Sequence, residues 1–273
     1  MELRRASSRD ERVDGGALVL AGGTELVPLL RSGLVHADEL VDIRGVVPRG
    51  ISDGAIGAAA TLAELECDPQ VPEALREACR LAASPQLRNA GTLGGNLLQA
   101  TRCWYWRLGW ACRLHGGAEC FARDGEHREH AIFANGFCAS AHPSDVAAAL
   151  LALDATLLTN RRSLPVAELY RLPTEDDRRT TTLAPGELIL EVRVPECDRS
   201  TYLKAMGRKR WAFPLVGVAG ARVGGEVRVA LAGVAPVPWL LEDGFESATP
   251  LPDNAYKLDV ARALVARVRT ALA

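Results

Sequence analysis

Short apolar runs, interrupted by glycine turns and followed by amphipathic segments, predict a chain that mixes strands and helices. Residues 17–20 are apolar and end at Gly22 and Gly23, which indicates a buried strand followed by a tight turn. Residues 25–32 carry leucines at helical spacing, a proline in the first turn and a glycine behind them, and so predict a short helix. A strand, glycine turn and helix in this order direct backbone N–H groups at one point, where an anionic ligand is favoured.

The same patterns continue to the end of the chain, after a polar stretch at residues 1–16 that we expect to be a frayed lead-in. Strands are expected at residues 40–43, 56–60, 155–158 and 187–194, and a hairpin at residues 214–221 and 226–232 about Gly224 and Gly225. Helices are expected at residues 73–83, 145–153 and 258–272, and Thr61 with Glu64 is typical of a capping box. The proline-containing connector at residues 161–177 is the expected domain boundary.

A second glycine segment lies at residues 84–96. Gly91, Gly94 and Gly95 fall within five residues and are flanked by asparagine and threonine, so the backbone there can turn tightly and approach a ligand closely. Glycine-rich corners also occur in domains without ligands. From the residues alone, a phosphate cradle and a plain corner are equally good interpretations.

Composition narrows the class of protein. The chain has 273 residues, 48% hydrophobic and 24% charged, with a net charge of −2, which is ordinary for a globular protein of two or three domains. This charge gives no case for nucleic acid or an anionic membrane. The polar start lacks a signal-peptide core, and no run approaches the length of a membrane span. We therefore expect a cytoplasmic protein with reduced cysteines.

Four of the seven cysteines lie within 36 residues, at Cys103, Cys112, Cys120 and Cys138. Their spacing is neither that of a zinc ribbon nor the compact ferredoxin run. Aromatic residues that could shield a cluster lie among them, at Trp104, Tyr105, Trp106 and Trp110, together with His115, His127, His130 and His142. An iron–sulfur cluster, a zinc site that mixes cysteine and histidine, and buried unligated thiols all remain open from spacing alone.

Taken together, these motifs resemble the flavin-binding subunit of the molybdenum hydroxylases, the xanthine dehydrogenase family. The matching segments are LAGGTEL at residues 20–26, ASPQLRNAGTLGGNL at 83–97, HPSD at 142–145, ELILEVRVP at 187–195, YLKAMGRKRWAFPLVGVA at 202–219 and GVAPVPW at 233–239. The cysteine-containing insert is similar to that of the flavin subunits of 4-hydroxybenzoyl-CoA reductase and periplasmic aldehyde oxidoreductase.

The resemblance implies an α+β, vanillyl-alcohol-oxidase (PCMH)-type FAD-binding fold with two subdomains and a small, shortened C-terminal α+β domain. The expected units are residues 1–60, residues 61–172 with the iron–sulfur insert at about residues 99–141, and residues 173–273.

The resemblance also implies which residues bind FAD. The first segment would wrap the pyrophosphate through Leu20, Ala21, Gly22, Gly23, Thr24, Glu25 and Leu26, and the second would complete the cradle through Asn89, Thr92, Gly94, Gly95 and Asn96. Asp145 would hold a polar part of the dinucleotide, Leu190 or its neighbour would line the flavin region, and Lys204 would approach the flavin. No catalytic residue is nominated.

The insert implies a [4Fe–4S] cluster on the four clustered cysteines. The function implied is electron transfer through FAD between a partner that carries the molybdenum cofactor, with a [2Fe–2S] subunit, and an external small-molecule or protein acceptor. Both ends of the chain are shorter than is usual in the family, which puts those partners in doubt. The alternatives are a stand-alone flavin/iron–sulfur oxidoreductase acting on a small organic substrate, and a non-catalytic zinc and nucleotide-binding module.

Overall fold

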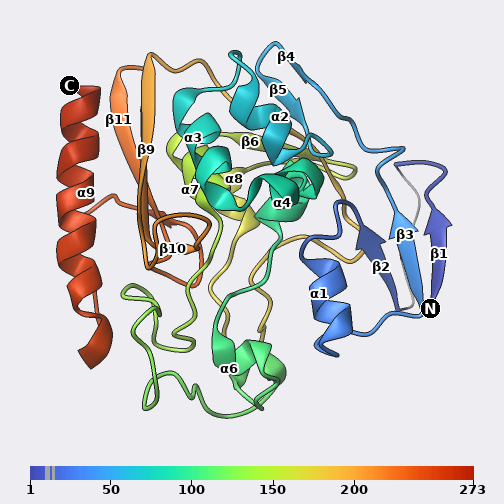
Figure 1. Ribbon diagram of the computed structural model, residues 1–273, viewed down its shortest axis with the longest axis horizontal. Coiled ribbons are helices and arrows are strands. Elements are labelled where there is room, and N and C mark those ends of the chain that lie inside the picture. The colour runs from blue at the N-terminus through green and yellow to red at the C-terminus, as the bar shows by residue number, and fades with distance from the viewer. Residues whose placement is uncertain (10–12, 14–15) are drawn as a thin grey trace.

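The computed structural model describes residues 1–9, 13 and 16–273 and arranges them as three β-sheets with helices packed against them (Figure 1). The first sheet is parallel, in the order β1 (Glu2–Arg5), β3 (Glu39–Asp42), β2 (Ala17–Leu20). The second is antiparallel, in the order β4 (Ile51–Ser52), β5 (Ala55–Gly57), β8 (Ile189–Arg193), β6 (Thr156–Thr159), β7 (Ser163–Pro165). The third is antiparallel, in the order β12 (Trp239–Leu240), β11 (Glu226–Ala232), β10 (Pro214–Val223), β9 (Arg199–Met206).

The helices of the described residues lie mostly between the second and third sheets. They are α1 (Leu26–Arg31), α2 (Leu62–Cys67), α3 (Glu73–Ala82), α4 (Pro85–Ala90), α5 (Leu93–Leu97), α6 (Trp104–Arg107), α7 (Asp145–Ala152), α8 (Val166–Leu169) and α9 (Tyr256–Leu272). Every residue of α7 is buried, because this helix contacts α3 on one side and β10 and β11 on the other. Its run of alanines and leucines, apolar all round, is what such a central position requires.

The C-terminal helix α9 covers the outer face of the third sheet, on the side of the molecule opposite the first sheet (Figure 1). Val265, Val268 and Leu272 face the sheet and are buried. A Cβ on Gly220 of β10 would lie 2.3 Å from Val268 Cγ1, so the helix approaches the sheet as closely as the missing side chain allows.

Much of the predicted secondary structure is confirmed. The helices expected at residues 73–83, 145–153 and 258–272 are α3, α7 and α9, and β10 and β11 form the hairpin about Gly224 and Gly225. The capping box is also confirmed, because Thr61 Oγ1 accepts the Glu64 N–H while the Glu64 carboxylate accepts the Thr61 N–H.

The polar lead-in is different from our expectation. Residues 2–5 form β1, which pairs with β3 and is held by an Arg4–Glu39 ion pair at 2.7 Å. The expectation of a frayed segment is wrong for these residues, since the parallel partner satisfies their backbone groups. Residues 10–12, 14 and 15 of the lead-in lie outside the described part of the chain.

Both expected domain boundaries, after residues 60 and 172, fall inside the span of the second sheet, because β5 pairs with β8. The boundaries stay predictions. The expected insert, residues 99–141, holds α6 and a 3-10 turn, Arg113–His115, and otherwise follows an irregular path at one edge of the molecule (Figure 1). Among the described residues, no helix combines the length and apolar character needed to cross a membrane.

Candidate functional site

A cavity of about 270 Å³ lies between the first sheet, helices α1 and α5, and the chain entering β8. Nine of the residues that the sequence predicted as cofactor contacts line it: Ala21, Gly22, Gly23, Thr24, Glu25, Leu26, Thr92, Gly94 and Gly95. The two glycine segments, about 70 residues apart in the sequence, therefore meet at one cavity. Its volume approaches the lower end of the range for small-molecule sites.

The two glycine segments are in direct backbone contact. A Cβ on Gly22 would lie 2.0 Å from the carbonyl oxygen of Ala90, the last residue of α4. Gly23 has φ +72°, in the left-handed region that favours glycine. The first turn thus needs glycine for two separate reasons, close approach at Gly22 and backbone conformation at Gly23.

The second glycine segment is helical, which the sequence analysis did not predict. Thr92 caps the short helix α5, with its Oγ1 accepting the Gly95 N–H at 3.2 Å, and the Leu93 N–H donates to Ala60 O at 2.8 Å. Ser84 caps α4 in the same manner. The caps hold the segment helical, and backbone bonds between residues 91–94 and residues 58–62 hold it in the cavity wall.

A smaller cavity of about 80 Å³ adjoins the first and shares Thr24, Glu25 and Gly95 with it. Asn96 and Asp145 line this second cavity, together with Arg102 and Phe213. Asn96 is held in place because its Oδ1 accepts the Ser144 hydroxyl at 2.6 Å. The two cavities therefore meet along these shared residues.

Asp145 is the first residue of α7 and is fully buried between two donors from β9. Lys204 Nζ donates to its Oδ2 at 2.8 Å, and the Tyr202 hydroxyl donates to its Oδ1. Lys204 Nζ also donates to the Leu81 carbonyl at 2.8 Å. Burial raises the pKa of the Asp145 carboxyl, although Lys204 and Tyr202 act in the opposite direction. Both carboxylate oxygens are therefore satisfied within the protein.

Four of the predicted cofactor contacts, all of them among the described residues, line neither of these two cavities: Leu20, Asn89, Leu190 and Lys204. Asn89 is exposed on α4, and Leu190 is buried in β8. The neighbours Leu188 and Ile189 line the first cavity instead, which agrees with the expectation that Leu190 or its neighbour lines the site. Lys204 does not line the site itself but is hydrogen-bonded to Asp145, which does.

Glu187 was missed by the sequence analysis. It lines the first cavity, and its side chain is 1% exposed. Burial alone would raise its pKa, but the Ala184 N–H, Arg162 and Thr159 bond to the carboxylate and lower the pKa below its ordinary value. No local pattern marks this residue, because two of its partners, Thr159 and Arg162, come from a segment at least 25 residues away.

The four clustered cysteines lie in one neighbourhood of the insert. The side chains of Cys120 and Cys138 are hydrogen-bonded, and the charges of Cys112 and Cys120 both act on Cys103. The bond from Cys138 lowers the pKa of Cys120 to about 6, whereas burial raises the pKa of Cys103 to about 11. These thiols therefore influence one another, unlike the remote Cys67 and Cys197.

Aromatic rings enclose this neighbourhood. Tyr105, Trp110 and Phe121 pack with ring centroids 4.9 to 6.3 Å apart, and Trp104 packs edge-on against His130 at 4.6 Å. His130 Nε2 lies 3.2 Å from Cys103 Sγ. Across the described residues, however, no three or more His, Cys, Asp or Glu side chains are arranged to hold a metal ion. The predicted metal site is thus not shown.

Comparison with known proteins identifies the class. Residues 3–197 match the family described as the FAD binding domain in molybdopterin dehydrogenase. The chain belongs to this family of oxidoreductase flavoproteins, and the predicted α+β FAD-binding fold is confirmed.

Among curated relatives, the aldehyde oxidoreductase FAD-binding subunit PaoB of Escherichia coli (strain K12) is 34% identical over 93% of this chain and 90% of its own. The carbon monoxide dehydrogenase medium chain of Hydrogenophaga pseudoflava is 28% identical over 84% of this chain and 70% of its own.

Solved structures share the fold. Carbon monoxide dehydrogenase from Hydrogenophaga pseudoflava, in a form that lacks the Mo-pyranopterin moiety of the molybdenum cofactor, has a chain that matches with a TM-score of 0.69. That match has 24% identity and covers 99% of this chain and 96% of the other. A chain of quinoline 2-oxidoreductase from Pseudomonas putida 86 matches with the same TM-score, the same coverage and 22% identity.

Proposed function

We propose that this chain is the electron-transferring FAD subunit of a molybdenum-hydroxylase-type complex, with FAD in the two adjoining cavities and a [4Fe–4S] cluster on the insert. The observation that carries the proposal is the meeting of both glycine segments at one cavity, in a chain that belongs to an FAD-binding family. FAD, when bound, supplies the capacity to accept and release electrons singly or in pairs.

The residues present fit FAD. Gly22 leaves no room for a side chain and Gly23 has a left-handed backbone, so this turn presents backbone N–H groups, which can bind the pyrophosphate. In this proposal the segments Leu20 to Leu26 and Thr92 to Asn96 hold the pyrophosphate, with Asn89 at the edge. Asp145 holds a polar part of the dinucleotide in the second cavity, and Lys204 acts there through its bond to Asp145. Leu188 and Ile189, the neighbours of Leu190, line the flavin region in the first cavity.

We assign the cluster to Cys103, Cys112, Cys120 and Cys138. Support comes from their shared neighbourhood and from the aromatic shield around it. A four-iron cluster is larger than one ion and holds its thiolates further apart, so a fit to the cluster does not require the geometry of a single-ion site. The cluster, when bound, supplies one-electron transfer.

The proposed partners are a molybdenum-cofactor subunit and a [2Fe–2S] subunit, with an external electron acceptor. The support is that similar chains are named as parts of larger enzymes. One is a subunit of the 6-hydroxypseudooxynicotine dehydrogenase complex of Paenarthrobacter nicotinovorans, 29% identical over 67% of this chain and 51% of its own. Location in the cytoplasm stays a prediction.

The test is anaerobic purification of the full chain, followed by a visible spectrum, release of flavin by heat, and iron and sulfide analysis. We expect one FAD and about four irons for each chain. Cys112→Ser should lose the iron and keep the flavin, while Cys67→Ser, outside the insert, should keep both.

Two results would overturn the proposal. Zinc in place of iron would refute the cluster and favour the mixed zinc site. Oxidation of an aldehyde by the chain alone, with an artificial acceptor, would favour the stand-alone enzyme over the subunit.

A further inference from the structure

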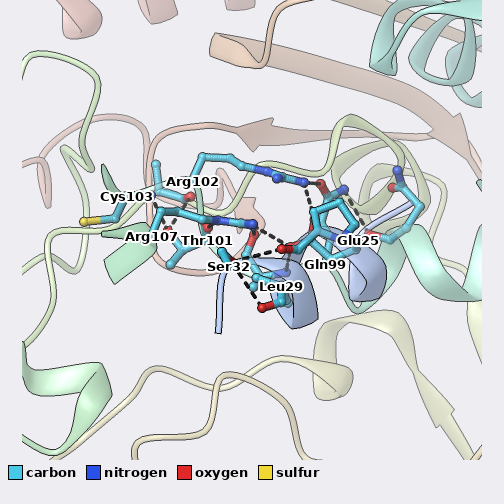
Figure 2. Close-up of polar contacts among 12 residues, drawn as sticks. Glu25, Leu29, Ser32, Gln99, Thr101, Arg102, Cys103 and Arg107 are labelled. Atoms are coloured by element: carbon cyan, nitrogen blue, oxygen red, sulfur yellow. Dashed lines mark hydrogen bonds and ion pairs between the residues drawn. The ribbon is translucent and has the colours of Figure 1, made fainter. Parts of the chain in front are cut away.

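Glu25 belongs to two parts of the protein at once. Its backbone lies in the first glycine segment, where its carbonyl accepts the Leu29 N–H at 3.2 Å and starts α1. Its side chain points away from that segment, toward the insert (Figure 2). Glu25 therefore belongs to the first glycine segment, residues 20–26, which we call the flavin cradle, and also contacts the segment that leads to the cysteines.

The Glu25 carboxylate gathers three donors from the start of the insert. Oε2 accepts Arg102 Nη2 at 2.7 Å, and Oε1 accepts the Ala100 N–H at 3.1 Å as well as Arg107 Nη2. The side chains of Glu25 and Arg107 are 16% and 19% exposed. Partly buried, multiply bonded ion pairs of this kind are worth more than isolated surface pairs.

These bonds position Cys103. Arg107 Nε donates to the Thr101 carbonyl at 2.8 Å, and Thr101 Oγ1 accepts the Cys103 N–H at 3.1 Å. The Arg107 N–H in turn donates to Cys103 O at 2.9 Å. Residues 100–107 thus fold around one carboxylate, with Cys103 at the start of α6, as Figure 2 shows.

The second arginine, Arg102, joins the Glu25 contact to the second cavity of the site. The Arg102 guanidinium lies 4.3 Å from the centre of the Phe213 ring. Both residues line the second cavity, and both also line a small cavity of about 40 Å³ beside Cys103 and His130. The pair therefore forms a common wall between the dinucleotide site and the cysteine neighbourhood.

We propose that Glu25 is a positioning residue that couples the flavin cradle to the cysteine insert. When FAD binds the first glycine segment, it orders the turn before α1 and so holds the Glu25 carboxylate where Arg102 and Arg107 bind it. Conversely, when the insert is ordered, its arginines hold the Glu25 carboxylate and keep this turn in the conformation that binds FAD. Coupling of this kind is reciprocal and usually amounts to a roughly 5- to 150-fold change in affinity. The inference rests on the proposed function only in placing FAD in the first cavity.

The test is a double-mutant cycle on the FAD dissociation constant of the full chain, measured by flavin fluorescence. Glu25→Gln keeps the shape and removes the charge, and we expect affinity to fall roughly tenfold. Arg107→Gln changes a residue that lines neither flavin cavity, and we expect a similar fall. The double variant should be no weaker than either single one, because all three lose the same contact.

Glu77→Gln is the matched control, because Glu77 pairs with Arg80 on the exposed side of α3, and it should bind FAD as the unchanged chain does. Glu25→Asp retains the charge and should recover part of the affinity. If Arg107→Gln fails to fold by circular dichroism, Arg107→Lys, which keeps the charge and loses the paired geometry, takes its place in the cycle.

A second measurement follows the insert. In chain freed of metal by chelation, we expect FAD to slow the alkylation of Cys103 by iodoacetamide, and Glu25→Gln to abolish that protection. Unchanged FAD affinity in Arg107→Gln, or additive losses in the double variant, would refute the coupling. A wild-type chain that does not bind FAD would instead refute the proposed function, before any variant is compared.

Discussion

Lys204 Nζ lies 2.8 Å from Asp145 Oδ2, and neither side chain is more than 1% exposed. The family resemblance implied a separate cofactor contact for each residue. In the structure they form one buried unit with Tyr202, which bonds to the other carboxylate oxygen. This unit joins α7 to β9 directly beneath the second cavity, so it has a structural task whether or not a cofactor is bound.

Breaking this buried pair should destabilise the protein strongly. Asp145→Asn leaves the Lys204 ammonium without its charged partner, and we expect the free energy of unfolding to fall by about 3 to 5 kcal/mol. Urea unfolding followed by circular dichroism measures the change. Asp259→Asn, in an exposed pair at 4.0 Å, is the control and should change it little.

The double variant Asp145→Asn with Lys204→Met should be less destabilised than the sum of the two single variants, because it leaves no unpaired buried charge. Strict additivity would contradict the pairing.

Gly22→Ala should disrupt the contact between the two glycine segments. Its Cβ would need to move away from the Ala90 carbonyl, which lies only 2.0 Å from the ideal position, and backbone cannot yield as a side chain can. We expect a loss of about 1 to 3 kcal/mol in unfolding free energy together with weaker FAD binding. Gly45→Ala, where the added Cβ meets nothing within 4 Å, should bind FAD normally. Equal effects of the two substitutions would refute the steric account.

Acid should destabilise the protein through His142. Burial lowers the pKa of His142 to about 3, whereas the unfolded chain has an ordinary histidine pKa of about 6.5. Between these values the unfolded state binds more protons, so stability falls as the pH drops from about 6.5 to 3, by up to about 1.4 kcal/mol for each pH unit. His142→Gln should flatten the curve of unfolding free energy against pH in this window.

Part of the slope should survive in that variant, because burial also lowers the pKa of His130, to about 4. The informative quantity is therefore the difference between the two curves. Parallel curves from pH 7 to 4 would show that His142 takes no part.

The sequence was informative wherever a local pattern decides the structure. The amphipathic stripe of α3, the capping box at Thr61 and the hairpin at Gly224 need only neighbouring residues, and the structure contains all three. The first glycine turn was equally predictable from the sequence, because a strand, two glycines and a helix follow one another directly.

Features made by distant segments could not be predicted in this manner. The strand β1 is polar and forms because β3 lies beside it. Helices α4 and α5 are short, α5 contains Gly94 and Gly95, and caps and tertiary contacts override their weak propensity. Glu187 and the carboxylate contacts of Glu25 depend on partners 28 and up to 82 residues away, a relationship that no sequence window contains.

The first cavity draws its walls from residues as early as Val19 and as late as Ile189. A ribosome must therefore deliver about seven-tenths of this chain before the walls can close. In the proposed site the dinucleotide therefore meets complete walls only after residue 189 has been made, and a fragment that stops before β8 lacks part of the site. Cofactor supply would then act as a late checkpoint in synthesis, after the first sheet and the insert have already emerged.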